Sequence, residues 1–183
     1  MSGETLVKYG SPTLAGMKTG SLFTCPFETP EALRDALRFW NEALTPKGVR
    51  LLPLRYRGGR ALLYLYRPSR LCRDLQNETA CRLLRDRGYG VEAPDRCIAR
   101  LGRRIRESEE FPHEIGLFLG YPPEDVCGFI ENRAGSCKCV GCWKVYGDAE
   151  AARKIFAKFK TCTRVYLEQY TKGIPVERLT VAG

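Results

Sequence analysis

The feature that most constrains the fold is a pair of apolar segments joined by two glycines. The segments VRLLPLRYR (49–57) and RALLYLYR (60–67) flank Gly58 and Gly59. A two-residue Gly-Gly link supplies the positive φ angles that a tight hairpin turn requires. Pro53 has no amide hydrogen for a strand ladder, so it belongs at a sheet edge or a bulge. The sequence therefore predicts an antiparallel hairpin over about 49–57 and 60–67.

Two further segments resemble strands. In LAGMKTGSLFT the apolar positions are spaced by small residues, which predicts a strand over about 16–24 with its glycines at a bulge or a close backbone approach. A second strand is predicted over about 140–146, and residues 176–181 have the composition of a closing strand. Residues 1–14 are polar and contain a glycine and a proline, which predicts a flexible N-terminal arm.

The predicted helices begin at capping residues that are followed by proline or acids. Thr29-Pro30-Glu31 combines a capping hydroxyl, a proline at the first helical position and an acid that the helix dipole favours. Apolar residues then recur along one stripe of that helix. Similar signals predict further helices over about 68–87, from Pro94, after His113, from Pro123 and over about 148–170.

This order of elements lacks the regular strand–helix alternation of a doubly wound sheet. A chain of 183 residues, of which 44% are hydrophobic, is long enough to form one ordinary domain with a core. We therefore expect an α+β fold in which several helices pack on a small antiparallel or mixed sheet. The predicted domain covers residues 15–183, and its strands lie near 16–24, 49–57, 60–67 and 140–146.

The chain is basic, with a net charge of +9, and 21 of its 30 basic residues are arginine. Such a charge suits an anionic ligand, nucleic acid or an acidic redox partner protein, although it serves equally well to keep a protein soluble. The sequence contains neither an apolar run of about 20 residues nor a basic leader followed by an apolar segment. We therefore expect a cytoplasmic protein that does not bind a membrane.

Five arginines within residues 96–106 form the densest basic patch of the sequence. On a helix such a patch can contact phosphate groups or nucleic acid, and it equally fits a solvated face that is balanced by nearby glutamates. A lysine and a hydroxyl on the glycine-rich predicted strand could also meet an anion. The residues expected at an anion site are Arg100, Arg103, Lys18, Thr19 and Lys144.

Three of the nine cysteines lie within six residues of one another. Cys137, Cys139 and Cys142 share a loop with a glycine, and thiolates that converge on one point bind zinc, iron or an iron–sulfur cluster. The familiar two Cys-x-x-Cys pairs are absent, so a fourth ligand would be His113, another cysteine or an external group. Cys139 and Cys142 alone have the spacing of a redox dithiol. Incidental thiols at the start of a strand are the third interpretation.

His113 is the only histidine, and it precedes Glu114 where a short helix is expected to begin. A histidine beside a carboxylate fits a general acid or base that the carboxylate orients. An enzyme of this kind needs a pocket, for which Tyr121 and Trp143 are the predicted lining residues. The alternative is a histidine that hydrogen-bonds the backbone at a helix terminus. A zinc protease is excluded, because no His-Glu-x-x-His motif is present.

The segments FPHEIGLFLGYPPEDVCGFIEN, CWKVYGD and KTCTRVY together resemble a known family. The chain is similar to the family of domains of unknown function numbered 3793, which is found mainly in anaerobic bacteria of the Clostridia type. SPTLAGMKTGSLF near the start and ERLTV near the end resemble the ends of the same family, so the likeness covers nearly the whole chain. The resemblance implies a single domain without an established activity, and a link to flavodoxin and iron-uptake functions that favours a metal or redox role.

Three functional hypotheses follow from the sequence. We rank first a metal-binding or redox-associated module that uses the loop from Cys137 to Cys142. An arginine-rich binder of nucleic acid or of a phosphate-bearing ligand comes second. A small-molecule enzyme that uses His113 and Glu114 comes third.

Overall fold

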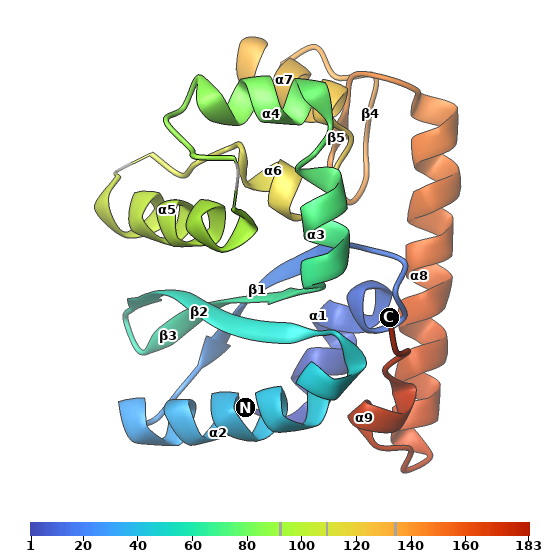
Figure 1. Cartoon of the computed structure of the whole chain (residues 1–183). Helices are drawn as coiled ribbons and strands as arrows, with labels where there is room; N and C mark the ends of the chain where they lie inside the picture. The colour runs from blue at the N-terminus through green and yellow to red at the C-terminus, as the bar shows by residue number, and fades with distance from the viewer. Residues whose placement is uncertain (92, 109, 134) are drawn as a thin grey trace. The chain divides into compact units, whose positions relative to one another are not determined.

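The computed structural model describes residues 1–91, 93–108, 110–133 and 135–183 (Figure 1). The chain divides into two compact units. Unit 1 consists of residues 1–70 and 161–183, and unit 2 consists of residues 71–160. Each unit contains helices, and each has an antiparallel sheet, with three strands in unit 1 and two in unit 2. The predicted α+β class with a small antiparallel sheet is therefore confirmed.

The sheet of unit 1 is built on the predicted hairpin. Strands β1 (Gly20–Pro26), β2 (Arg50–Arg57) and β3 (Arg60–Tyr66) are antiparallel in the order β1-β3-β2. Gly58 and Gly59 adopt φ angles of 55° and 67°, which glycine adopts without steric cost. The register of β2 against β3 shifts between Pro53 and Arg55, so the proline lies at an irregularity of an edge strand.

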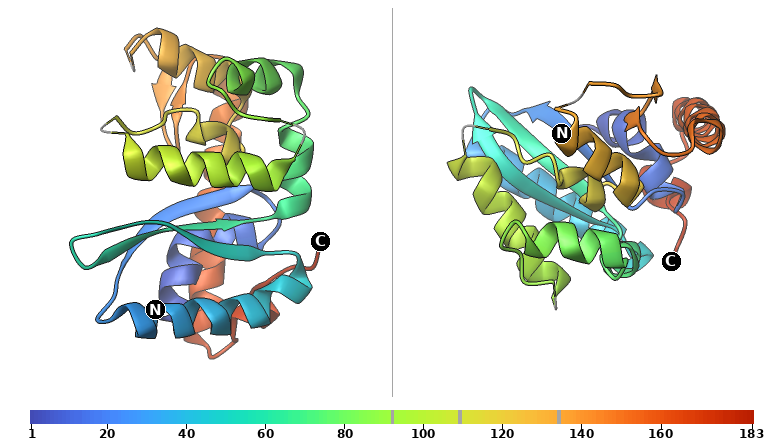
Figure 2. Two further views of the ribbon diagram at one scale, coloured as in Figure 1. Left: turned by 60° about the vertical axis from the view of Figure 1, so that its left-hand side comes forward. Right: turned by 90° about the horizontal axis from the view of Figure 1, so that it is seen from above.

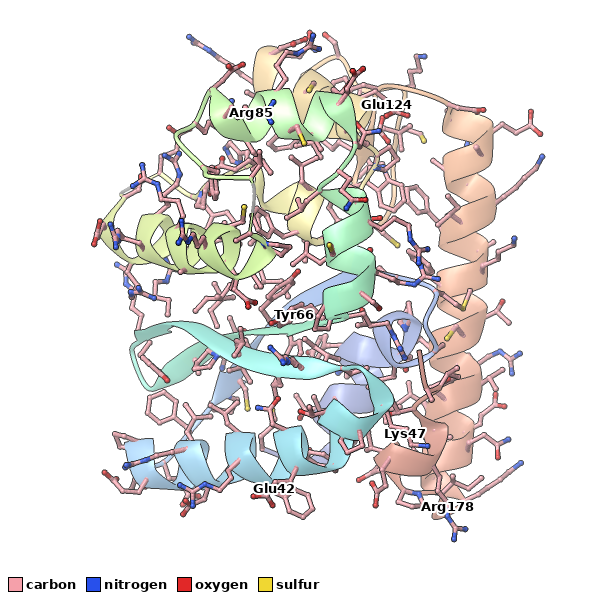
Figure 3. The ribbon with its side chains drawn as sticks, viewed as in Figure 1. Glu42, Lys47, Tyr66, Arg85, Glu124 and Arg178 are labelled. Atoms are coloured by element: carbon pink, nitrogen blue, oxygen red, sulfur yellow. The ribbon has the colours of Figure 1, made fainter. Side chains whose placement is uncertain are left out.

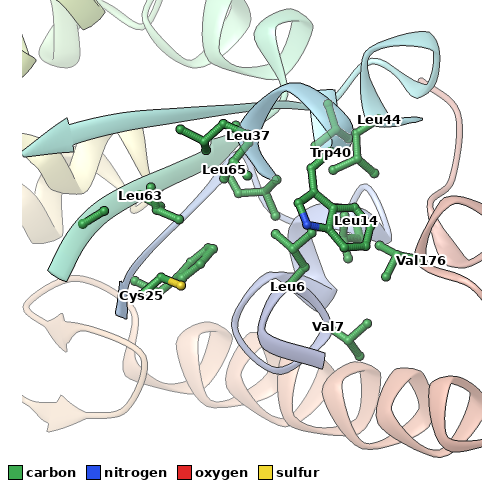
Figure 4. Packing of buried hydrophobic residues seen from close by; sticks show 14 of the residues in the cluster. Leu6, Val7, Leu14, Cys25, Leu37, Trp40, Leu44, Leu63, Leu65 and Val176 are labelled. Carbon is green, nitrogen blue, oxygen red and sulfur yellow. The ribbon is translucent and has the colours of Figure 1, made fainter. Parts of the chain in front are cut away.

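Helices α1 (Gly3–Leu14) and α2 (Pro30–Leu44) cover one face of this sheet (Figure 2). Thr29 caps α2, since its Oγ1 accepts a hydrogen bond of 3.1 Å from the amide of Ala32. The predicted apolar stripe of α2 is buried, and Figure 4 shows part of it beside residues of α1 and β3. The side chain of Asn41 donates to the carbonyl of Leu51 and accepts from its amide, both at 2.9 Å, and so ties α2 to β2.

Residues 3–14 were expected to belong to a flexible arm, but they form helix α1 with a buried face. Ser2 Oγ accepts from the amide of Thr5 at 3.3 Å, and Leu6 and Leu14 are fully buried. The sequence suggested an arm because Gly10 and Pro12 commonly end helices. Gly10 instead lies so close to Leu65 that a side chain at this position would collide with it. The glycine thus serves packing, and the proline lies in the last turn of the helix.

Two other expectations for the backbone are wrong. The segment 176–181 contains the short helix α9 (Val176–Leu179) in place of a closing strand, and Thr180 Oγ1 donates to the carbonyl of Val176 at 2.7 Å. The single helix expected over 68–87 is two helices, α3 (Pro68–Asp74) and α4 (Glu78–Arg85). The break occurs because Asn77 Oδ1 accepts from the amides of Thr79 and Ala80 and starts a new helix.

Unit 2 is organised around helix α7 (Pro123–Glu131), which contacts α4, α6 (Ile115–Phe118) and β5 (Lys144–Val145). Helix α5 (Pro94–Glu107) precedes α6, and helix α8 (Ala149–Thr171) begins in unit 2 and ends in unit 1. The strand expected over 140–146 is a short hairpin of β4 (Cys139–Val140) and β5. Trp143, Val145, Ala152 and Phe159 form a buried cluster in this unit.

None of the helices in the described part of the chain has the length and apolar character needed to cross a bilayer.

The net positive charge of the chain is concentrated in the sequence of unit 1. That unit has 14 basic and 7 acidic residues, whereas unit 2 has 16 basic and 14 acidic residues. Exposed charges of both signs occur in unit 2, among them Arg85 on α4 and Glu124 on α7 (Figure 3). The second unit is nearly balanced in charge even though α5 is rich in arginine.

A buried arginine joins four segments of unit 1. Arg67 is 2% exposed, and its Nε donates to the carbonyl of Thr13 at 2.6 Å. Its Nη2 donates to the carbonyls of Leu14 and Val181, both at 2.7 Å, and its Nη1 donates to the carbonyl of Lys47 at 3.4 Å. Because burial removes water from the guanidinium, the pKa of Arg67 is lowered, and the carbonyl oxygens at the end of α1 replace that water.

Replacing Arg67 with methionine should lower the free energy of unfolding by about 2–4 kcal/mol, because the buried carbonyls lose charged donors. Urea denaturation measures this loss. The matched control is Arg38→Met, which removes an exposed arginine of α2 and should change stability by less than about 0.5 kcal/mol. Equal stability of the two variants would contradict the role assigned to Arg67.

Candidate functional site

A pocket of about 290 Å³ opens in unit 2 between α6, α7 and the β4–β5 hairpin. We call it the aromatic pocket, because four of its lining residues carry aromatic six-membered rings. The aromatic lining residues are Phe111, Tyr121, Phe129 and Trp143. The remaining lining residues are His113, Ile115, Gly116, Asp125, Val126, Val140, Gly141 and Lys144.

Asp125 fixes one wall of the aromatic pocket. It lies in the first turn of α7, where the helix dipole favours a carboxylate, and it is 3% exposed. Its Oδ2 accepts a hydrogen bond of 2.7 Å from Nε1 of Trp143. Its Oδ1 accepts from the amides of Tyr146 and Gly147, both at 2.7 Å. These bonds attach the end of β5 to α7 and hold the indole in one orientation, so Asp125 has a structural role.

The aromatic rings of this wall support one another. Tyr121 stacks on Trp143 with ring centroids 4.8 Å apart, and Phe156 meets Trp143 edge-on at 4.5 Å. Tyr121 donates its hydroxyl to the carbonyl of Cys142 at 3.2 Å. Burial raises the pKa of Tyr121 to about 12, so its hydroxyl stays neutral near pH 7. At Gly116, a Cβ would lie 2.7 Å from Val126 and 3.1 Å from Tyr121, so only glycine allows this close packing.

His113 and Lys144 are the basic side chains of the aromatic pocket. His113 has a side chain that is 40% exposed, and its ring meets Phe129 edge-on at a centroid distance of 4.9 Å. Its Nε2 lies 3.8 Å from Oε1 of Glu110. Nζ of Lys144 lies 5.9 Å from the ring centroid of Phe129, within reach of a cation–π contact. The pocket therefore combines aromatic faces with two groups that can donate to a bound molecule.

Glu114 belongs to a different network from the one that was expected. Its carboxylate is 2% exposed and accepts a hydrogen bond of 2.9 Å from the hydroxyl of Tyr89. Oε1 also pairs with Nε of Arg104 at 2.8 Å, and Oε2 with Nε of Arg87 at 3.5 Å. Within the described residues, Glu114 makes no contact that would orient His113, so the proposed acid–base pair is not formed. Burial and the neighbouring carboxylate both raise the pKa of Tyr89.

A second, more polar cavity of about 730 Å³ lies beside the first. We call it the arginine cleft, because Arg87, Arg104 and Arg133 line it. Its other lining residues are Ser108, Glu110, Phe111, Pro112, His113, Glu114, Phe129 and Ile130. Phe111, His113 and Phe129 line both cavities, so these two sites have a common rim.

The residues expected at an anion site are not brought together. Arg100 and Arg103 lie on α5, where Arg103 is exposed, and neither lines either cavity. Lys18 and Thr19 belong to unit 1, where the carbonyl of Thr19 accepts from the amide of Arg67 at 2.9 Å. Lys144 lines the aromatic pocket.

The predicted metal site has no support in the structure. Cys137 and Cys139 are partly buried, and Cys142 is exposed in the turn of the hairpin. Cys139 packs against the apolar cluster of unit 2. Over the ranges that the structure describes, no three side chains among His, Cys, Asp and Glu are placed to hold a metal ion. The spacing of thiols in the sequence did not make them converge in space.

Sequence reasoning missed several residues that build these cavities. Phe111 and Phe129 line both cavities, and neither was among the residues expected at a site. Asp125 was also not among the residues expected at a site, although it holds the indole of Trp143. The arginines of the cleft come from three separate segments of the chain, so no local pattern could have united them.

A family model described as "Protein of unknown function (DUF3793)" matches residues 6–180. The chain belongs to this family. The resemblance inferred from the segments around His113 and Trp143 is therefore confirmed over nearly the whole chain. Searches of curated proteins and of solved structures each found no match. The match identifies the DUF3793 family and assigns no activity.

Asp125→Ala should lower the free energy of unfolding by at least about 3 kcal/mol, because three buried N–H groups lose an ionised acceptor. Chemical denaturation measures the loss, and tryptophan emission should shift to the red as Trp143 loosens. Glu124→Ala is the control, since it removes an exposed acid from the same helical turn. If both variants were equally stable, Asp125 would not hold the wall.

Proposed function

We propose that the aromatic pocket of unit 2 binds a small, flat and largely apolar organic molecule. The observation that carries this proposal is the set of aromatic rings around one cavity, with the Trp143 indole held by Asp125. Ligand pockets are typically lined by apolar and aromatic side chains with a few placed polar groups. Because the indole is already held in place, its contact with a ligand costs little side-chain entropy.

The dimensions of the pocket limit the ligand to one ring or two fused rings. Its volume of about 290 Å³ lies at the lower end of the range for small-molecule sites, which starts near ~300 Å³. The rings of Trp143 and Phe129 favour a planar partner that they can contact face-on or edge-on. Nitrogen atoms of His113 and Lys144 are the groups that would orient a polar substituent of this molecule.

An enzyme that uses His113 as acid or base on the bound molecule is the second candidate. It is supported by the partial exposure of His113 and by its place in the lining of both cavities. Glu114 is not part of this candidate, because its carboxylate is occupied by Tyr89, Arg104 and Arg87.

The charge distribution does not favour nucleic acid as the ligand of unit 2. Its 16 basic residues are accompanied by 14 acidic ones, and this near balance of charge gives little overall attraction for a phosphate backbone. Metal binding is not part of the proposed function, because no group of three His, Cys, Asp or Glu side chains within the described ranges is placed to hold a metal ion.

Binding of a flat ring can be tested with two probes that differ in shape and little in polarity. Benzyl alcohol is planar in its ring, whereas cyclohexylmethanol is not. In ligand-observed NMR, benzyl alcohol should bind at least about fivefold more tightly, because only a planar ring fits against the aromatic wall. Equal binding of both probes, or binding of neither, would contradict the proposal.

The location of binding can be tested at the mouth of the pocket. Val140 lines the pocket and is 68% exposed, so Val140→Asp should leave the fold intact while it places a charge beside an apolar ligand. The affinity for benzyl alcohol should fall at least about fivefold. Val181→Asp makes the same change at a residue of unit 1 that is 51% exposed, and it should have no effect.

A further inference from the structure

We propose that the arginine cleft is an anion site, so that the ligand of unit 2 carries a phosphate or carboxylate group beyond its flat ring. This inference rests on the proposed function of the aromatic pocket. The ring would occupy that pocket, and the acidic group would extend over the common rim into the cleft. His113, which is partly exposed at this rim, lies between the two parts of the site.

Two of the three arginines of the cleft, Arg87 and Arg104, are oriented by a buried carboxylate. Arg104 and Arg87 both use Nε to approach the buried carboxylate of Glu114, and Tyr89 donates a hydrogen bond to the same carboxylate. Within the described residues, the terminal Nη nitrogens of the two arginines have no hydrogen-bond or ion-pair partner. Terminal guanidinium nitrogens are the donors with which arginine binds phosphate and carboxylate groups. A guanidinium that is already oriented loses less entropy when it binds an anion.

The charges around the cleft favour an anion. Its three arginines face two carboxylates, Glu110 and Glu114. One arginine is enough to neutralise the buried carboxylate of Glu114, but two arginines form ion pairs with it. Arg133 adds a further positive charge, which is exposed. Glu110 is largely exposed, with 85% of its side chain accessible, so solvent weakens its effect. The surplus of positive charge beside an aromatic pocket therefore selects for a ring that bears an acidic group.

Three probes with the same ring separate this inference from the proposed function. They are benzyl alcohol, phenylacetate and benzyl phosphate, which are neutral, singly charged and up to doubly charged at pH 7. Benzyl phosphate or phenylacetate should bind at least about fivefold more tightly than benzyl alcohol, and the tighter of the two identifies the acidic group. If all three bind equally, the anion site is overturned and the aromatic pocket stands. If none binds, the proposed function itself fails.

Charge-matched variants show whether the cleft is responsible. Arg133→Gln removes an exposed cleft arginine that does not contact Glu114, and Arg87→Gln leaves Arg104 and Tyr89 on that carboxylate. Each should lower the affinity for the anionic probe at least threefold and leave that for benzyl alcohol unchanged. Arg103→Gln makes the same change in charge outside the cleft and should have little effect. An equal loss in Arg103→Gln would mean general attraction by charge and would overturn the inference.

Discussion

The three hydrogen bonds that Asp125 accepts hold together the wall of the aromatic pocket. They join the first turn of α7 to the indole of Trp143 and to the backbone that follows β5. A two-residue strand pair such as β4–β5 is too short to be stable alone, so it needs an anchor of this kind. Burial of the carboxylate is tolerated because both of its oxygens accept hydrogen bonds.

Unit 1 uses the opposite charge for a similar purpose. Arg67 donates to carbonyl oxygens at the end of α1 and to the carbonyl of Val181, so one buried cation joins segments that are distant in sequence. In both units a buried ion is compensated largely by backbone groups. Such contacts leave little trace in the sequence, because any residue can supply the amide or the carbonyl.

The sequence predicted best those elements whose signals are local. The Gly58–Gly59 turn and the Thr29 cap lie where they were expected, since each acts within a few residues. Helix α1 was missed because Gly10 serves packing against Leu65, which only the folded chain reveals. Four of the residues predicted at a site, His113, Tyr121, Trp143 and Lys144, line one pocket. The sequence suggested that Glu114 orients His113 and that three thiols bind a metal ion, and the structure supports neither arrangement in the part of the chain that it describes. Side chains that are close in sequence can be directed to different places in the fold.

The most direct test of the central claim is a crystal structure of the protein soaked with small aromatic acids and alcohols. The account predicts electron density for a ring between Trp143 and Phe129, with an acidic group directed toward Arg87 or Arg133 and with Asp125 still bound to the indole. Density for the same compounds only at other places, with the aromatic pocket closed or its indole turned away from Asp125, would contradict it.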